Sequence, residues 1–442
     1  MVERRWSMVV SGALALGVAS VSQPAAAATK VERVVSPGGI EAYLISEPSI
    51  PFLSMSIYFA GGAALDPVGK EGLAYMVSGL LDEGAGELDS QAFRTELEDL
   101  AIRLSFDAQR DSFTGELKTL TEHRERAFEL LRLALAQPRF DPEPVERIRN
   151  QIQASLRRSA EDPDYVASLT WFETAFPGQP YGRPVLGTVE SVAGLQVDDL
   201  RTFVSTRLAK DNLVVGVAGD VTAAELGPLL DLAFGDLPAA GAPDVLAATE
   251  PKGGLTVWEH KDVPQSQVVF GESGLARDDP DYYAAYVANH ILGGGGFTSR
   301  LTEEVREKRG LAYSVYSYLY PLELAPIWLG GLGTSNRSVD EALRLVRQEI
   351  ERIAAGDITQ EQLDDAKTYL TGSFPLRLTS NDRLAGTLVG MQVDDLGIDY
   401  LERRNDHIEA VTLEHARRVA ARLYDPEALL VVVVGGARGS SG

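Results

Sequence analysis

Hydrophobic positions along the chain follow both periods that define regular secondary structure. Apolar and polar residues alternate over 111–120, as in a half-buried strand. Apolar residues recur at helical spacing over 90–104, 122–136 and 142–159, and the last helix has Pro142 at an early position where its missing N–H costs little. Strands and amphipathic helices therefore alternate, which predicts an α/β (α+β) fold with helices covering a sheet.

The pattern of elements occurs twice along the chain. Three segments of the first half match segments of the second: Ser54–Gly62 with Ser266–Gly274, Gly72–Leu81 with Tyr282–Leu292, and Val197–Gly219 with Thr412–Gly435. These pairs are a strand ending at Gly, a helix, and a helix followed by a buried apolar strand. Their nearly constant offset indicates a duplicated domain.

The domain boundaries follow from this repeat and from local composition. We predict a first domain over 29–237 and a second over 254–442. Between them, residues 238–253 are rich in Pro, Ala and Gly and lack periodicity, which predicts a linker. In the second half, Thr359 and Gln362 have the spacing of a capping box before a helix that we expect to reach Leu370.

Residues 1–28 have the pattern of a secretory signal peptide. Arg4 and Arg5 precede an apolar stretch over 9–21, and residues 24–28 offer small side chains for cleavage. A retained membrane anchor is the alternative, but the apolar stretch is too short to span a bilayer comfortably. We expect a periplasmic or secreted bacterial protein with no stable membrane insertion after cleavage.

Composition excludes several classes of function. The formal net charge of -23 argues against nucleic-acid binding, which needs an excess of Lys and Arg. The chain has no cysteine, so disulfides, thiolate metal sites and a Cys nucleophile are excluded. Adjacent carboxylates such as Asp394 and Asp395 point apart on a helix and are expected on the solvated surface.

One predicted helix resembles a metal-binding motif whose ligands have been replaced. Gly72–Gly86 reads GLAYMVSGLLDEGAG, and it resembles the zinc helix G-L-A-H-x-x-E-H-x-L-x-x-G of the M16 (pitrilysin-like) peptidases. The His, Glu and His positions hold Tyr75, Ser78 and Gly79. The family's third ligand, a Glu on a later helix, corresponds to Ser155.

These replacements remove the zinc chemistry. A peptidase zinc needs about three protein ligands and one open position for water. Tyr75 is a poor ligand because a phenol titrates near pH ~10, Gly79 has no side chain, and Ser78 cannot act as the carboxylate base. The five histidines of the chain show no other metal spacing. We therefore expect no cofactor on this chain.

A second family segment lies in the other half. Residues 293–316 read GGGGFTSRLTEEVREKRGLAYSVY, which resembles the M16 segment G-G-G-x-x-S-R-L-x-x-x-[LV]-R-E-K-x-G-L-A-Y-S-V. In active relatives an Arg and a Tyr of this segment reach the peptide near the scissile bond, and they correspond to Arg306 and Tyr313. Both side chains donate hydrogen bonds and could hold a carbonyl or an oxyanion. The alternative is that Tyr313 packs in the core and Arg306 is an ordinary surface charge.

The glycine run at the start of this segment has three interpretations. It resembles a Gly-rich stretch that helps recognise substrate in the non-catalytic subunit of mitochondrial processing peptidase, which implies substrate binding by Gly293, Gly294, Gly295 and Gly296. A plain loop that ends a helix is the second. A phosphate cradle is the third, but the run follows a helix and lacks the G-K-[ST] ending. Pro180–Thr188 also resembles a family segment and is expected to be a structural loop.

The resemblance covers essentially the whole chain after residue 28 and implies a function. It implies duplicated M16-type domains, in a family whose subunits close like a clam around a chamber. The sequence therefore predicts a catalytically silent subunit that acts on peptides in trans with a zinc-bearing M16 partner, which would supply the Zn. A non-enzymatic structural or peptide-binding protein is the alternative, and a self-sufficient hydrolase is a third.

Overall fold

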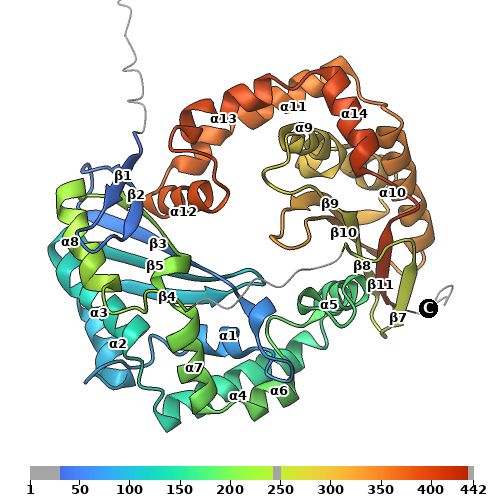
Figure 1. Cartoon of the computed structure of the whole chain (residues 1–442). Coiled ribbons are helices and arrows are strands. Elements are labelled where there is room, and N and C mark those ends of the chain that lie inside the picture. Colours follow the sequence, from blue (N-terminus) through green and yellow to red (C-terminus); the bar gives the residue numbers. More distant parts are fainter. Residues whose placement is uncertain (1–29, 242–249, 437–442) are drawn as a thin grey trace, which may run out of the picture.

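Each half of the chain is built around one mixed sheet in the structure, a computed structural model that describes residues 30–241 and 250–436 (Figure 1). The predicted signal segment 1–28 and residues 242–249 of the predicted linker lie outside the described residues. The domain boundaries around them stay a prediction. In the two described ranges, no helix combines the length and the apolar character needed to cross a bilayer.

The two sheets share one strand order. The first runs β1-β2-β6-β3-β5-β4 and the second runs β7-β11-β8-β10-β9, so the second repeats the first without β1. The strands are β1 Glu32–Val35, β2 Glu41–Ser46, β3 Phe52–Ala60, β4 Arg103–Ala108, β5 Ser112–Leu120, β6 Leu213–Gly219, β7 Thr256–His260, β8 Gln265–Ser273, β9 Ala312–Tyr320, β10 Ile327–Ser335 and β11 Leu430–Gly435. One pair in each repeat, β2–β6 and β7–β11, is parallel, and the other pairs are antiparallel. This repeated topology confirms the predicted duplication and fold class.

Helices cover the sheets. Those of the first half are α1 Leu73–Ser78, α2 Ser90–Asp99, α3 Arg124–Ala136, α4 Pro142–Ser159, α5 Pro163–Ala175, α6 Val189–Gly194, α7 Val197–Arg207 and α8 Ala223–Phe234. Those of the second are α9 Tyr282–Asn289, α10 Val339–Ala354, α11 Gln360–Gly372, α12 Asn381–Val393, α13 Tyr400–Glu409 and α14 Leu413–Leu423. The capping box predicted at Thr359 is confirmed at the start of α11.

Each half lends one helix to the sheet of the other (Figure 1). Helix α5 packs on β8 and β11, where Trp171 is fully buried and donates its indole N–H to the carbonyl of Leu430 at 3.2 Å. Helix α12 packs on β2, β3 and β6, where Leu388 is fully buried. The face of β11 opposite α5 packs in the core of the second half, so both faces are covered, which explains its unbroken apolar sequence LVVVVG.

One predicted helix is too long. The periodicity over 90–104 predicts a single helix, but α2 ends at Asp99 and Leu104 belongs to β4. Ala101 has a φ of 52°, and the N–H of Ile102 bonds to the carbonyl of Leu97 at 2.8 Å, which closes the helix end. Leu104 is buried from a strand, so its apolar character satisfied the helical pattern by coincidence.

Candidate functional site

Helix α1 keeps the backbone frame of the predicted zinc helix. The buried carboxylate of Asp66 accepts the N–H of Gly72 at 3.0 Å and the N–H of Ala74 at 3.2 Å, which fixes the start of the helix. Gly72 has a φ of 90°, a left-handed conformation that favours glycine. A Cβ there would also lie 2.7 Å from the carbonyl oxygen of Leu186.

The side chains on this frame are packed or already hydrogen-bonded. Tyr75 is half-buried against the core of the first half. The buried hydroxyl of Ser78 donates to the carbonyl of Tyr75 at 2.8 Å. A methyl carbon of Ile148, from α4, lies 3.4 Å from where a Cβ of Gly79 would be. Ser155 lies later on α4, half-buried. Aliphatic and aromatic groups thus occupy the region next to the ligand positions.

Two carboxylates follow α1, and arginine side chains pair with one of them. Glu83 is buried and pairs with Arg147 at 2.5 Å and with Arg94 at 3.4 Å. Burial raises the pKa of Asp82 to about 6, and the Glu83 carboxylate adds to this shift. Within residues 30–241 and 250–436, no three His, Cys, Asp or Glu side chains are grouped in a way that could hold a metal ion.

The structure brings Arg306 and Tyr313 together. Arg306 lies in a π-helix, η7 (Thr302–Glu307), and its guanidinium carbon is 5.5 Å from the ring centroid of Tyr313. The same carbon lies 4.8 Å from the ring centroid of Phe297. Tyr313 is 82% exposed and Phe297 is 70% exposed, so the interpretation that Tyr313 packs in the core is wrong.

Tyr313 is exposed because β9 contains a bulge. Ala312 pairs with Thr334 and Ser314 pairs with Gly333, which leaves Tyr313 as the extra residue. Bulges and single-turn π-helices both occur often at functional sites, because they re-aim individual side chains. Strand β9 is also an edge of its sheet, so one side of its backbone faces away from the other described strands.

Sequence reasoning missed Phe297 and the tyrosines that follow on β9. Tyr316 is 46% exposed, and its ring stacks with that of Tyr318 at 6.3 Å between centroids. The one sequence signal for Phe297 is a large apolar residue inside a run of glycines and small polar residues. The signal for the tyrosines is their alternation in YSVYSYLY, which was open to a core interpretation as well.

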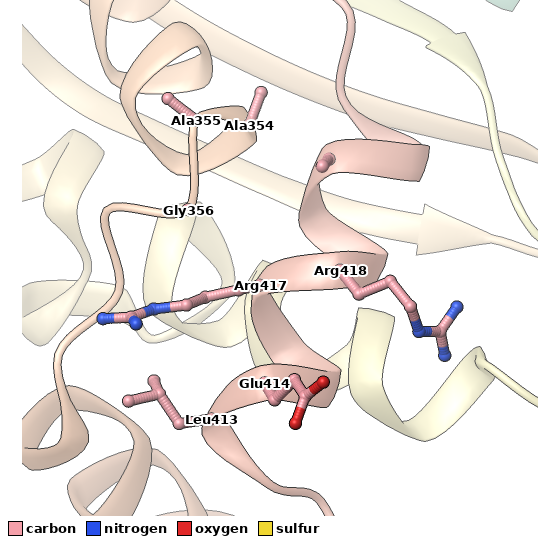
Figure 2. A pocket seen from close by; sticks show the side chains of 8 residues that line it. Ala354, Ala355, Gly356, Leu413, Glu414, Arg417 and Arg418 are labelled. Atoms are coloured by element: carbon pink, nitrogen blue, oxygen red, sulfur yellow. The ribbon is translucent and has the colours of Figure 1, made fainter.

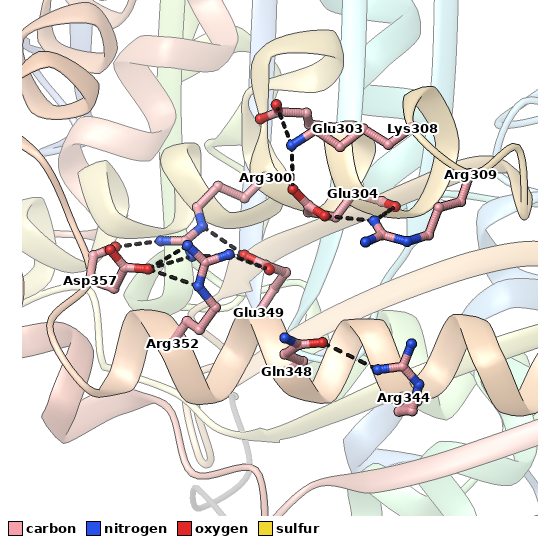
Figure 3. A network of polar contacts seen from close by, with 10 residues as sticks. All are labelled: Arg300, Glu303, Glu304, Lys308, Arg309, Arg344, Gln348, Glu349, Arg352 and Asp357. Atoms are coloured by element: carbon pink, nitrogen blue, oxygen red, sulfur yellow. Dashed lines mark hydrogen bonds and ion pairs between the residues drawn. The ribbon is translucent and has the colours of Figure 1, made fainter.

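Other charged residues of the same segment have structural roles (Figure 3). Arg300 is buried and bonds to Glu349 of α10 at 2.8 Å and to the carboxylate of Asp357 at 3.2 Å. Arg352 bonds to both of these acids, at 2.9 Å and 2.8 Å. This network ties the segment to α10. Arg306 differs, since its one ion pair among the described residues is with its neighbour Glu307 at 3.4 Å.

Close packing explains most of the glycine run. Gly293 and Gly294 lie in the π-helix η5 (His290–Gly294), and a Cβ on Gly293 would lie 2.3 Å from the hydroxyl of Ser317. A Cβ on Gly294 would lie 2.8 Å from the amide nitrogen of Asn289, and one on Gly295 would lie 2.7 Å from the carbonyl oxygen of His290. Gly296 faces open space with a φ of 59°. Their role in substrate binding stays a prediction.

A groove between the two halves has a volume of about 760 Å³. Tyr58 and Asp111 line it from the first half, and Arg277, Glu323 and Asp394 line it from the second. Asp394 is half-buried in this groove, whereas its neighbour Asp395 is exposed, as expected for both. Burial raises the pKa of Asp394, and the Arg277 guanidinium, 3.5 Å away, opposes that shift. Asp394 directly follows α12, whose apolar face packs on the first sheet, and this packing places Asp394 at the groove.

A second hollow, of about 630 Å³, lies between the end of α10 and α14 (Figure 2). Its two arginines are already engaged in protein contacts. Arg417 donates to the carbonyl of Ile358 at 2.6 Å, and Arg418 donates to Asp281 at 2.5 Å. Both guanidinium groups in this hollow are therefore already hydrogen-bonded within the protein.

Comparison with known proteins agrees with this picture. Residues 42–189 match the family model for Insulinase (Peptidase family M16), and residues 194–370 match that for the Peptidase M16 inactive domain. The chain is similar to a protein of Helicobacter pylori named Non-peptidase homolog YmxG, with 32% identity over 330 residues, 74% of this chain and 76% of that protein.

Two further relatives extend the match. Mitochondrial-processing peptidase subunit beta of Blastocladiella emersonii is 23% identical over 424 residues, 92% of this chain and 88% of that protein. The crystal structure of a peptidase M16 inactive domain from Pseudomonas fluorescens has a TM-score of 0.87 at 27% identity and covers 93% of this chain and 100% of that one. The chain therefore belongs to peptidase family M16, as an inactive-type member with substituted zinc-site positions.

Proposed function

We propose that this chain is the non-catalytic subunit of a two-chain zinc endopeptidase. The partner is a second M16 chain with an intact zinc helix, which supplies the metal, the attacking water and the general base. This chain contributes Arg306 and Tyr313 to the peptide held at that zinc. The proposed setting is the bacterial periplasm or the medium outside the cell.

One observation carries the proposal: Arg306 lies against two exposed aromatic rings, and its one described ion pair, with Glu307 at 3.4 Å, is at the surface and not in the core. Its guanidinium lies 4.8 Å from the centroid of Phe297 and 5.5 Å from that of Tyr313. Aromatic faces hold a cation in place without neutralising its charge. The guanidinium and the phenol thus remain available as hydrogen-bond donors to a carbonyl oxygen that gains negative charge during hydrolysis.

The outer edge of β9, which pairs with no other described strand, is the proposed place for the peptide. An extended peptide can add to an exposed strand through backbone hydrogen bonds, with side chains recognised alternately. The exposed Tyr316 and Tyr318 provide aromatic contacts along the same strand. The substituted α1 positions and the relative named as a non-peptidase homolog support a silent role, and the relative named as a peptidase subunit supports assembly with another chain.

The test is reconstitution with a zinc-motif M16 chain, ideally one encoded beside this gene. We expect the isolated chain to have no peptidase activity and the co-purified pair to cleave peptides in a zinc-dependent manner. Activity of the partner alone that equals activity of the pair would contradict the proposal. A stable two-chain complex that has no peptidase activity would favour the structural or peptide-binding alternative instead.

A further inference from the structure

A pocket of about 320 Å³ lies in the second half, between α9, α12, α13 and the short helix η8 (Phe374–Leu378). Its charged lining consists of three arginines, Arg277, Arg377 and Arg404, and one acid, Asp394. The lining of this pocket therefore has a net positive charge, whereas the whole chain has a net charge of -23. Arg277 and Asp394 also line the groove between the halves, so the pocket adjoins that groove.

Arg404 is a buried guanidinium without a carboxylate partner. It is 4% exposed, and its Nη1 donates to the carbonyl of Leu370 at 2.8 Å and to the amide oxygen of Asn405 at 3.0 Å. Its Nε and Nη2 have no acceptor among residues 30–241 and 250–436, yet they are not sealed from solvent. A buried charge is normally paired, because leaving it unpaired is costly.

The other two arginines play different parts. Arg277 is already engaged, since it donates to the hydroxyls of Tyr283 at 3.1 Å and Tyr400 at 3.3 Å and faces Asp394. Arg377 is exposed on η8 and has neither a hydrogen bond nor an ion pair to any residue that the structure describes. Two cationic groups at this pocket are therefore free to meet an anion.

The walls of the pocket are aromatic. The guanidinium carbon of Arg404 lies 4.3 Å from the ring centroid of Phe374, and that of Arg277 lies 4.3 Å from the ring centroid of Tyr282. Tyr286 and Tyr400 add two more rings to the lining. Flat apolar walls with a few polar groups are typical of sites for small ligands.

We propose that this pocket binds a carboxylate carried on an aromatic group. The free Nε and Nη2 of Arg404 form a fork that matches the two oxygens of a carboxylate, and Arg377 adds a second positive charge at the opening. Such a ligand could be a free aromatic acid or the aromatic C-terminal residue of a peptide. The proposal does not depend on Arg306, on a partner chain or on peptidase activity.

The experiment is calorimetric titration of the full chain with three probes: 3-phenylpropionate, N-acetyl-glycyl-phenylalanine and the C-terminal amide of that dipeptide. We expect both carboxylates to bind and the amide to bind at least about tenfold more weakly, a loss of about 1.4 kcal/mol. The tighter of the two carboxylates identifies the source of the ligand. Equal binding of acid and amide, or no binding of either acid, would overturn the proposal.

Three variants locate the binding. Arg404→Gln removes the buried fork, and Arg377→Gln removes the exposed charge without disturbing any described contact. Each is expected to weaken carboxylate binding by about tenfold or more. Arg403→Gln is the matched control, because Arg403 is the preceding residue on α13 but is exposed and paired with Asp399 at 2.7 Å. If Arg377→Gln and a folded Arg404→Gln both bind as the parent does, the assignment is wrong.

Discussion

At the scale of single residues, Arg300 and Arg306 belong to one segment but differ in role. Arg300 is paired inside the protein, whereas Arg306 is accessible to a ligand. Arg300 is buried against Glu349, itself 2% exposed, and both residues have several hydrogen bonds. Arg306 is 33% exposed and contacts mainly two aromatic rings. Replacing each of these two arginines should therefore change the free energy of unfolding by different amounts.

We expect Arg300→Ala to lower the free energy of unfolding by about 3–5 kcal/mol, because it leaves the buried Glu349 carboxylate with one arginine fewer. Arg306→Ala is expected to change it by less than about 1 kcal/mol, as for other exposed side chains. Urea unfolding of both variants measures this directly. A large loss of stability from Arg306→Ala would mean that its role is structural.

Glu272, on β8, couples stability to pH. Burial raises its pKa to about 8 from an ordinary value of 4.5. Between these values the folded state keeps a proton that the unfolded state releases. The stabilising effect of this proton is complete below pH 4.5 and is lost as the pH rises through about 8.

We expect Glu272→Gln to be more stable than the parent by about 1–3 kcal/mol above pH 8, because the amide cannot ionise. The gain should shrink as the pH falls toward 4.5. Thermal unfolding across this pH range measures the effect. Glu361→Gln, at an exposed position on α11, serves as the control. A gain that does not depend on pH would contradict the proposed cause.

At the scale of elements, the glycine run 293–296 is needed for close packing, whether or not it also contacts substrate. We expect Gly293→Ala to destabilise the protein by about 1–3 kcal/mol, because its Cβ would lie 2.3 Å from the hydroxyl of Ser317. Gly372→Ala, in a helix with open space around the Cβ position, should be neutral or stabilising by up to about 1 kcal/mol. Denaturant midpoints for the two variants test this contrast.

Most elements could be predicted from the chain, because both halves repeat one hydrophobic pattern. Helix α4 begins at Pro142 as expected. The end of α2 was missed because Leu104 is apolar in a strand as it would be in a helix. The exposure of Tyr313 depends on a bulge, and Phe297 meets Arg306 only through the fold. Neither fact is encoded in local periodicity.

At the scale of the whole molecule, the exchange of α5 and α12 makes each half complete the other. The apolar cluster around Trp171 contains Leu329, Leu430 and Val432 from the second half. The cluster around Leu388 contains Ile45 and Ala218 from the first. The two repeats therefore share buried surface, which favours cooperative unfolding over independent domains.

We expect calorimetry to show one unfolding transition for the chain. Trp171→Ala should shift that whole transition downward, with a loss of about 3–5 kcal/mol. Hydrogen exchange should report the loss on strands of both halves. Leu376→Ala, at a side chain that is 67% exposed, should leave the temperature of the unfolding transition unchanged. Two resolved transitions, with only one moved by Trp171→Ala, would show that the halves unfold separately.

The most direct test of the central claim is the kcat of the reconstituted two-chain peptidase when this chain carries Arg306→Ala or Tyr313→Phe. We expect each variant to assemble normally and to lower kcat by about a hundredfold to a thousandfold, the range expected when a donor to a developing oxyanion is lost. Arg344→Ala, an exposed arginine on α10, should leave kcat unchanged. Full activity of a complex carrying both substitutions would contradict the claim that these residues act on the peptide.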